Sequence, residues 1–214
     1  MTSKRGKFIT LEGLEGVGKT SNRQLIERQL SDAGIDFIGT REPGGTDVGE
    51  RLRELVLHAD GSIQAETELL IMAASRLEHV AGLIEPALKR GEWVLCDRYL
   101  DASVAYQGAG RQLGVERVVQ LHELMGLSLQ PDLTVLLDMP VEAGLARMAA
   151  RGKPDRIESE SLAFFERARA AYLQRAKDDP DRFVVVDASR SLSDVGQEVA
   201  NAVQSLIDSE QGER

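Results

Sequence analysis

The clearest pattern with chemical potential is a glycine-rich loop that ends in lysine and threonine. Residues 13–20 read GLEGVGKT and match the pattern G-x-x-x-x-G-K-[ST] at every specified position. Glycines let successive backbone N–H groups turn toward an anion, and a following helix N-terminus adds partial positive charge. Lys19 can reach β- and γ-phosphate oxygens, and the Thr20 hydroxyl can bind the bridging Mg²⁺. The pattern predicts an ATP site formed by Gly13, Leu14, Glu15, Gly16, Val17, Gly18, Lys19 and Thr20.

A second pair of charged residues, Asp97 and Arg98, directly follows the apolar run WVLC. If that run is a parallel strand, both side chains stand at its carboxyl end, where ligands bind in open α/β sheets. Asp97 is then a candidate ligand of Mg²⁺ or of its bound water, and Arg98 can clamp a second phosphate. An Asp–Arg ion pair without a ligand is the alternative at this stage.

Composition and charge exclude several classes of protein. The 214 residues carry 35 acidic and 26 basic side chains, so the net charge of −9 argues against a general nucleic-acid binder. A single cysteine, Cys96, cannot form an intramolecular disulfide, which is typical of a cytoplasmic protein. The three histidines lack zinc-ligand spacing, and the apolar runs are too short for a membrane span or a secretory signal. No N-K-x-D tetrapeptide occurs, which argues against a GTPase.

Apolar periodicity predicts the elements that must position these residues. Short, almost continuously apolar runs alternate with stretches of helical period, which is typical of an α/β fold with a doubly wound parallel sheet. We expect one domain over residues 1–214, with five parallel strands and helices on both faces. The expected strands are residues 8–12, 35–40, 93–97, 134–138 and 183–187. The expected helices are residues 20–33, 49–58, 65–90, 115–125, 141–151, 159–177 and 192–208.

Five segments in order along the chain resemble the bacterial thymidylate kinase family, within the phosphate-loop nucleoside monophosphate kinases. They are LEGLEGVGKT (residues 11–20), TREPGGT (40–46), AASRLEH (73–79), DRYLDASVAYQG (97–108) and RGKPDRIE (151–158). The resemblance implies transfer of a phosphoryl group from ATP, with Mg²⁺, to dTMP, giving dTDP for dTTP synthesis. It also implies a homodimer. The alternative is a deoxynucleoside kinase of related fold, which differs in that its acceptor carries no phosphate.

The resemblance also implies roles for residues on the acceptor side. Arg53 and Arg98 would hold the acceptor phosphate with Glu42 nearby, and Glu15 would face the 3′-hydroxyl. Tyr106 would crowd the position of a ribose 2′-hydroxyl. The remaining assignments concern the thymine base: Arg76 at a carbonyl, Ser103 and Gln107 along the edge, and Met72 at the position where many relatives stack a phenylalanine.

The charged segment at about residues 147–158 resembles the mobile lid of that family. Because the phosphate loop of this chain contains no arginine, the resemblance implies that a lid arginine stabilises the charge of the transition state. Arg151 is the first candidate, with Arg147 and Arg156 as neighbours. Together with Lys19, Arg98, Glu15 and Mg²⁺, Arg151 completes the predicted catalytic set.

Overall fold

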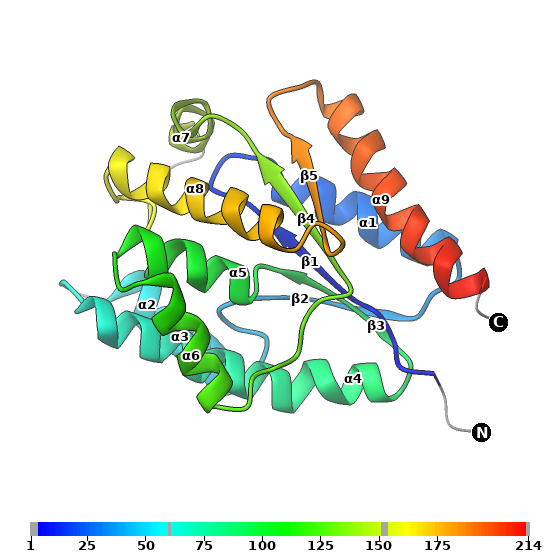
Figure 1. Cartoon of the computed structure of the whole chain (residues 1–214), viewed down its shortest axis with the longest axis horizontal. Helices are drawn as coiled ribbons and strands as arrows, with labels where there is room; N and C mark the ends of the chain where they lie inside the picture. Colours follow the sequence, from blue (N-terminus) through cyan, green and yellow to red (C-terminus); the bar gives the residue numbers. More distant parts are fainter. Residues whose placement is uncertain (1–3, 60, 151–153, 213–214) are drawn as a thin grey trace.

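A five-stranded parallel sheet forms the centre of the molecule (Figure 1). The computed structural model describes residues 4–59, 61–150 and 154–212. The strands are β1 (Phe8–Glu12), β2 (Phe37–Arg41), β3 (Trp93–Asp97), β4 (Leu133–Asp138) and β5 (Phe183–Asp187), in the order β2-β3-β1-β4-β5. All four neighbouring pairs are parallel. The predicted α/β class with a five-stranded parallel sheet is therefore confirmed.

Helices cover both faces of the sheet, which explains why its central strands are almost continuously apolar. Every residue of β1 is buried. Helices α1 (Lys19–Asp32) and α9 (Leu192–Gly212) pack against each other on one face (Figure 1). The other helical segments of the described chain are α2 (Asp47–His58), α3 (Ala65–His79), η1 (Val80–Ile84), α4 (Glu85–Lys89), α5 (Leu100–Ser103), η2 (Val104–Gly110), α6 (Val115–Leu124), α7 (Val141–Ala149) and α8 (Leu162–Asp178).

Several helix and strand ends are displaced by a few residues from the sequence-based expectation, and three segments differ in ways that are more informative. Strand β2 runs from Phe37 to Arg41 rather than over residues 35–40. The helix expected over residues 65–90 is divided by the π-helical segment η1, after which α4 begins with Pro86 in its first turn. Residues 100–110 form α5 and η2, a helical segment that the periodicity did not predict. Most of its side chains are buried, so it lacks the apolar-to-polar contrast of an amphipathic helix.

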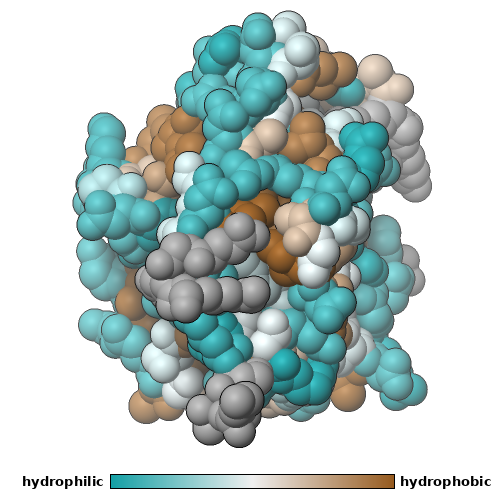
Figure 2. Space-filling view, turned by 90° about the vertical axis from the view of Figure 1, so that its right-hand side faces the viewer, coloured by the Kyte–Doolittle hydropathy of each residue, from teal (hydrophilic) through white to brown (hydrophobic). Residues whose placement is uncertain are grey.

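The side of the molecule on which both termini lie is mostly hydrophilic. Figure 2 shows hydrophobic residues there only as separate patches between polar ones. Among the described residues, no helix combines the length and the apolar character that crossing a membrane requires.

Candidate active site

A single pocket joins the two groups of residues that the sequence analysis singled out. It has a volume of about 330 Å³, within the range of roughly 300–1,000 Å³ that is usual for ligand sites. Its wall includes the phosphate loop and the side chains of Arg53, Arg98 and Tyr106. The pocket lies at the carboxyl ends of β1 and β3, where ligands bind in open parallel sheets.

The phosphate loop links the end of β1 to the first residue of α1. Gly18 caps that helix with a left-handed backbone (φ 91°) and no side-chain hydrogen bond. The N-terminus of α1 thus faces the pocket, and no capping side chain accepts a hydrogen bond from its first N–H groups, which leaves them available to an anion. Lys19 lies half-buried beneath the loop, where its Nζ donates to the carbonyl oxygens of Gly13 (3.1 Å) and Leu14 (3.0 Å). Burial, with Arg98 nearby, lowers the pKa of Lys19 to about 8.

Arg98, Glu15 and Tyr106 form one hydrogen-bonded group beside the loop. The Arg98 guanidinium donates to Glu15 Oε1 (2.7 Å) and to the Gly13 carbonyl (2.9 Å), and it lies 4.9 Å from the centre of the Tyr106 ring. Tyr106 donates its hydroxyl to both Glu15 oxygens at 2.8 Å, and burial raises its pKa, which keeps it a donor. Arg98 has a left-handed backbone (φ 69°), an unfavourable conformation for a residue with a side chain. This arrangement fixes a guanidinium against the phosphate loop.

Arg53 approaches the same pocket from α2. Its Nη1 donates to the carbonyl oxygen of Pro43 (2.9 Å), in the loop after β2, and it is half-buried. Burial, with Arg41 nearby, lowers the pKa of Arg53 from its ordinary value. Arg53 and Arg98, the two residues expected to hold the acceptor phosphate, therefore line one cavity with the phosphate loop.

Three predicted acceptor residues, Glu42, Arg76 and Ser103, form a buried cluster at the side of the pocket. Arg76 is 1% exposed and donates to Glu42 Oε2 (2.6 Å), Ser103 Oγ (3.0 Å) and the Tyr99 carbonyl (2.8 Å). Its Nη1 also lies 2.6 Å from His122 Nε2. Glu42 lines the pocket, whereas Arg76 and Ser103 do not. Arg76 thus holds Glu42 in place, and the expected contacts of Arg76 and Ser103 with a base stay predictions.

Met72 and Gln107 do lie on the pocket wall, from α3 and η2 respectively. Met72 is 7% exposed, so it belongs to the core and to the wall at once. Gln107 is 1% exposed, and its Nε2 donates to Glu68 Oε1 (2.8 Å). Both side chains therefore stay candidates for contact with the base.

Thr20 and Asp97 suit a Mg²⁺ ion that is shared with phosphate oxygens. Both line the pocket, and the buried Oδ1 of Asp97 has no hydrogen-bond partner among the described residues. Across the described part of the chain, no three His, Cys, Asp or Glu side chains gather as a ready metal cage. Mg²⁺ at phosphoryl-transfer sites is usually held by one or two protein oxygens with phosphate and water, so the residues present fit it.

The predicted lid is described in part. Arg151 lies outside the described residues. Asp155, Ile157 and Glu158 line the pocket. Arg147, in α7, donates to the Ala188 carbonyl (3.2 Å), and it is not among the residues that line the pocket. Arg156 donates to the Val56 carbonyl (2.7 Å) and to Glu68 Oε2 (2.6 Å). Two of the three lid arginines therefore have protein partners of their own.

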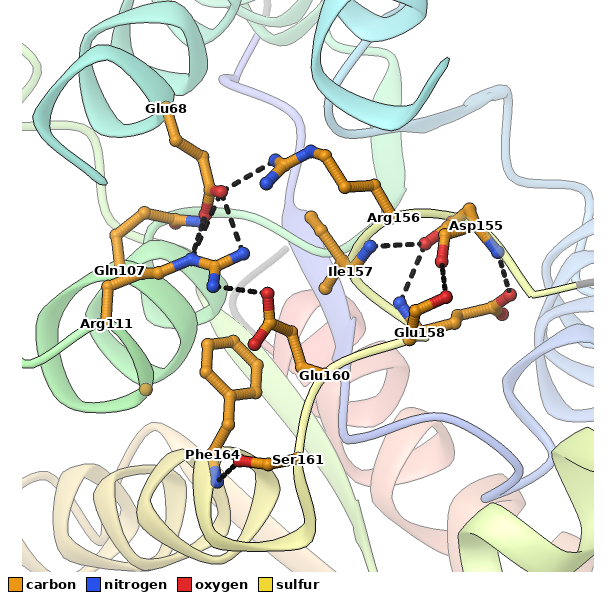
Figure 3. A network of polar contacts seen from close by, with 12 residues as sticks. Glu68, Gln107, Arg111, Asp155, Arg156, Ile157, Glu158, Glu160, Ser161 and Phe164 are labelled. Carbon is orange, nitrogen blue, oxygen red and sulfur yellow. Dashed lines mark hydrogen bonds and ion pairs between the residues drawn. The ribbon is translucent and has the colours of Figure 1, made fainter. Parts of the chain in front are cut away.

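Sequence reasoning missed a polar network between the lid segment and the helices beneath it. In Figure 3, Glu68 faces Gln107 and Arg111 on one side and Arg156 on the other, and Arg111 also contacts Glu160. The spacing of these residues along the chain gives no local signal. Glu68 itself stands just before the apolar run of α3 that starts at Leu69, among the polar residues of the first helical turn.

Three comparisons relate this chain to known proteins. A family model described as "Thymidylate kinase" matches residues 11–199. Proteins of that name from Pseudomonas savastanoi pv. phaseolicola and Bordetella petrii are each 50% identical to this chain. The first match covers 97% of this chain and 99% of the relative, and the second covers 95% and 98%. A crystal structure of thymidylate kinase from Ehrlichia chaffeensis matches with a TM-score of 0.76 at 31% identity, covering 94% of this chain and 99% of that one.

Proposed function

The chain belongs to the thymidylate kinase family, and we propose from that premise how its residues carry out the family's reaction. That reaction is transfer of the γ-phosphoryl group of ATP to dTMP with Mg²⁺, giving dTDP and ADP. The alternative of a deoxynucleoside kinase is not favoured by these relationships. The observation that carries the proposal is the shared cavity of the phosphate loop with Arg53 and Arg98, because a phosphoryl acceptor that is itself a phosphate needs cationic groups of its own.

On the donor side, we assign the phosphates of ATP to the backbone N–H groups of residues 13–20 and to Lys19. To bind β- and γ-phosphate oxygens, Lys19 would exchange its present carbonyl partners for the nucleotide. Thr20 and Asp97 would hold Mg²⁺, which neutralises charge on the phosphate oxygens when bound.

On the acceptor side, Arg53 and Arg98 would hold the phosphate of dTMP in line with the γ-phosphate. One oxygen of the acceptor phosphate forms the new bond to the γ-phosphorus as the bond to the β-phosphate oxygen breaks, and ADP leaves. The protein contributes positioning and charge rather than a covalent intermediate. Glu15, held by Arg98 and Tyr106, would face the deoxyribose, and Tyr106 would occupy the space that a 2′-hydroxyl requires.

We assign the charge-stabilising lid arginine to Arg151, within a lid at about residues 147–158 of a single domain spanning residues 1–214. Arg147 and Arg156 are less suited because each donates to protein acceptors away from the phosphate loop. Loss of such an arginine costs on the order of 10³-fold in kcat in related phosphoryl-transfer enzymes. Arg151→Ala should therefore lower kcat far more than it raises the KM for dTMP.

The experiment that tests the acceptor assignment compares Arg53→Ala with the wild type in a coupled ADP-release assay. We expect kcat/KM for dTMP to fall at least a hundredfold, because the phosphate loses a charge-assisted clamp, while the Kd for ATP changes little. Activity on thymidine, which carries no phosphate, provides the comparison. An Arg53→Ala variant that kept its kcat/KM for dTMP would show that the acceptor phosphate binds elsewhere. A wild type that preferred AMP, dCMP or dGMP to dTMP would refute dTMP as the acceptor.

A homodimer is proposed from exposed apolar side chains on two adjoining helices. Val48 and Leu55 lie seven residues apart on α2, and Leu70 and Leu77 lie seven apart on α3, so each pair shares one helix face. The two helices pack side by side. Leu70→Lys should shift the species seen in sedimentation velocity from dimer to monomer, and a wild type that sediments as a monomer would refute the proposal. We also propose a cytoplasmic location, where ATP and dTMP are both available.

A further inference from the structure

Glu68 is a fully buried carboxylate in the first turn of α3, at the junction of three parts of the chain. It is 0% exposed and contacts Gln107 of η2, Arg111 after η2, and Arg156 of the lid segment (Figure 3). A buried charge persists only when several partners compensate its lost hydration. Here Arg111, Arg156 and the Gln107 amide compensate the charge of Glu68. Of these three partners, Gln107 also lines the pocket.

The contact with Glu68 fixes which way round the Gln107 amide stands. An ionised carboxylate can only accept hydrogen bonds, so the nitrogen of the amide must face Glu68, at 2.8 Å from Oε1. The amide oxygen is then directed away from Glu68. That oxygen is buried and has no hydrogen-bond partner among the described residues, although Gln107 lines the pocket. A buried acceptor without a partner is costly and is satisfied when a ligand supplies an N–H donor.

The two arginines keep Glu68 ionised and in place. Burial alone would raise its pKa, but hydrogen bonds from Arg111, Gln107 and Arg156 outweigh burial and hold the pKa below its ordinary value. Arg111 lies 3.1 Å and 3.2 Å from the two carboxylate oxygens, and Arg156 lies 2.6 Å from Oε2. Glu68 therefore presents Oε1 to Gln107 in the neutral pH range.

We propose that Glu68 is a positioning residue for base selection: it locks the Gln107 amide so that an acceptor oxygen, rather than an amide N–H, faces the base of the nucleoside monophosphate. The inference rests on the proposed function, since it requires the base to lie beside Gln107. Thymine and uracil carry an N–H at ring position 3, and cytosine has a lone pair there. The oriented amide accepts from the first two and repels the third.

Glu68→Gln is the matched substitution because it keeps the size of the side chain and replaces one oxygen with an NH₂ donor. Arg111 and Arg156 can only donate hydrogen bonds, whereas the Gln107 amide can also accept one. The remaining oxygen of the substituted side chain at position 68 should therefore face the arginines, and the new NH₂ group should face Gln107. Gln107 would then turn over, placing its own NH₂ toward the base. The orientation that favours uracil over cytosine is thereby reversed.

The test is the ratio of kcat/KM for dUMP to kcat/KM for dCMP, two substrates that differ at this edge but share the hydrogen at ring position 5. We expect Glu68→Gln to lower that ratio by about tenfold or more. Gln107→Met, which removes the acceptor, should lower it similarly. Equal losses for both substrates, with the ratio unchanged, would mean that Glu68 is merely structural and would overturn the proposal.

Glu160→Gln is the control, because Glu160 contacts Arg111 in the same network but not Gln107. Its ratio should equal that of the wild type, and a fall in this variant too would count against a specific role of Glu68. If Glu68→Gln unfolds at the assay temperature, Glu68→Asp replaces it in the test. This variant keeps a negative charge for the two arginines but withdraws the carboxylate from Gln107, so the ratio of kcat/KM for dUMP to that for dCMP should again fall. Failure of the wild type to phosphorylate dTMP at all would refute the proposed function instead.

Discussion

At the scale of single residues, the Lys19 side chain is held by the phosphate loop itself. Its ammonium group donates to two carbonyls of the phosphate loop and lies close to the Arg98 guanidinium, where burial and repulsion lower its pKa to about 8. Nucleotide phosphates bind the charged form of lysine. Because the neutral form becomes the major one above pH 8, part of the binding free energy must be used to protonate Lys19 in alkaline solution.

We therefore predict that Mg·ATP binds about tenfold more weakly at pH 9 than at pH 7, since the charged fraction of Lys19 falls by about that factor. Isothermal titration calorimetry across this range measures the Kd directly. Lys19→Arg is the control, because its guanidinium stays charged: it should bind less tightly throughout but with a flat pH profile. Parallel profiles for the two proteins would contradict the role given to Lys19.

At the scale of elements, the phosphate loop and α7 approach each other through two glycines. An ideal Cβ on Gly16 would lie 2.0 Å from the carbonyl oxygen of Gly144, and one on Gly144 would lie 2.6 Å from the carbonyl oxygen of Glu15. Both distances are shorter than real Cβ contacts, so either side chain would force backbone apart. Helix α7, which leads toward the proposed lid, is thus packed directly on the phosphate loop.

Gly144→Ala should consequently destabilise the protein by about 1–3 kcal/mol through overpacking and should weaken ATP binding by displacing the loop. Thermal denaturation with and without ATP measures both effects. Gly82→Ala is the matched control within η1, since its Cβ would make only an ordinary contact, 3.5 Å from Thr46 Cγ2. Equal melting temperatures for the two variants would show that the close approach to Gly144 is unimportant.

Sequence alone predicts the elements that have a distinct pattern. Strands β1, β3 and β5 span the predicted residues because each is a short, strongly apolar run beside a turn. The segment from Leu100 to Gly110 could not be predicted in this way, since burial on nearly all sides removes the contrast that periodicity detects.

The candidate site also has a part that the sequence predicts and a part that it does not. The phosphate loop is contiguous in the sequence, so its geometry follows from its own residues. The residues around Arg76 are not contiguous, because Glu42, Ser103 and His122 reach it from three separate parts of the chain. A resemblance can name such a residue, but only the packing of the elements shows that its guanidinium is engaged within the protein.

At the scale of the whole molecule, the interior holds two buried acidic side chains, Glu12 and Asp101, that interact electrostatically. Glu12, at the end of β1, accepts from the Tyr99 N–H and the Tyr172 hydroxyl, both at 2.7 Å. Asp101 nearby is held by Arg175 (2.9 Å) and Arg182 (2.7 Å). Burial, followed by repulsion from Asp101, raises the pKa of Glu12 to about 7. The ionised form of Glu12 is therefore disfavoured in the folded protein.

The sign of the resulting pH dependence follows from this shift. The unfolded chain releases the Glu12 proton near pH 4.5, whereas the folded chain keeps it until about pH 7, so the contribution to stability is full below pH 4.5 and is lost as pH rises through 7. Glu12→Gln carries no titrating proton. We expect the stability of the wild type relative to Glu12→Gln to fall by about 2 kcal/mol between pH 5.5 and pH 8, measured by urea unfolding at each pH. A difference that stayed constant, or grew with pH, would show that Glu12 is ionised in the folded protein and that the tyrosine hydrogen bonds outweigh its burial.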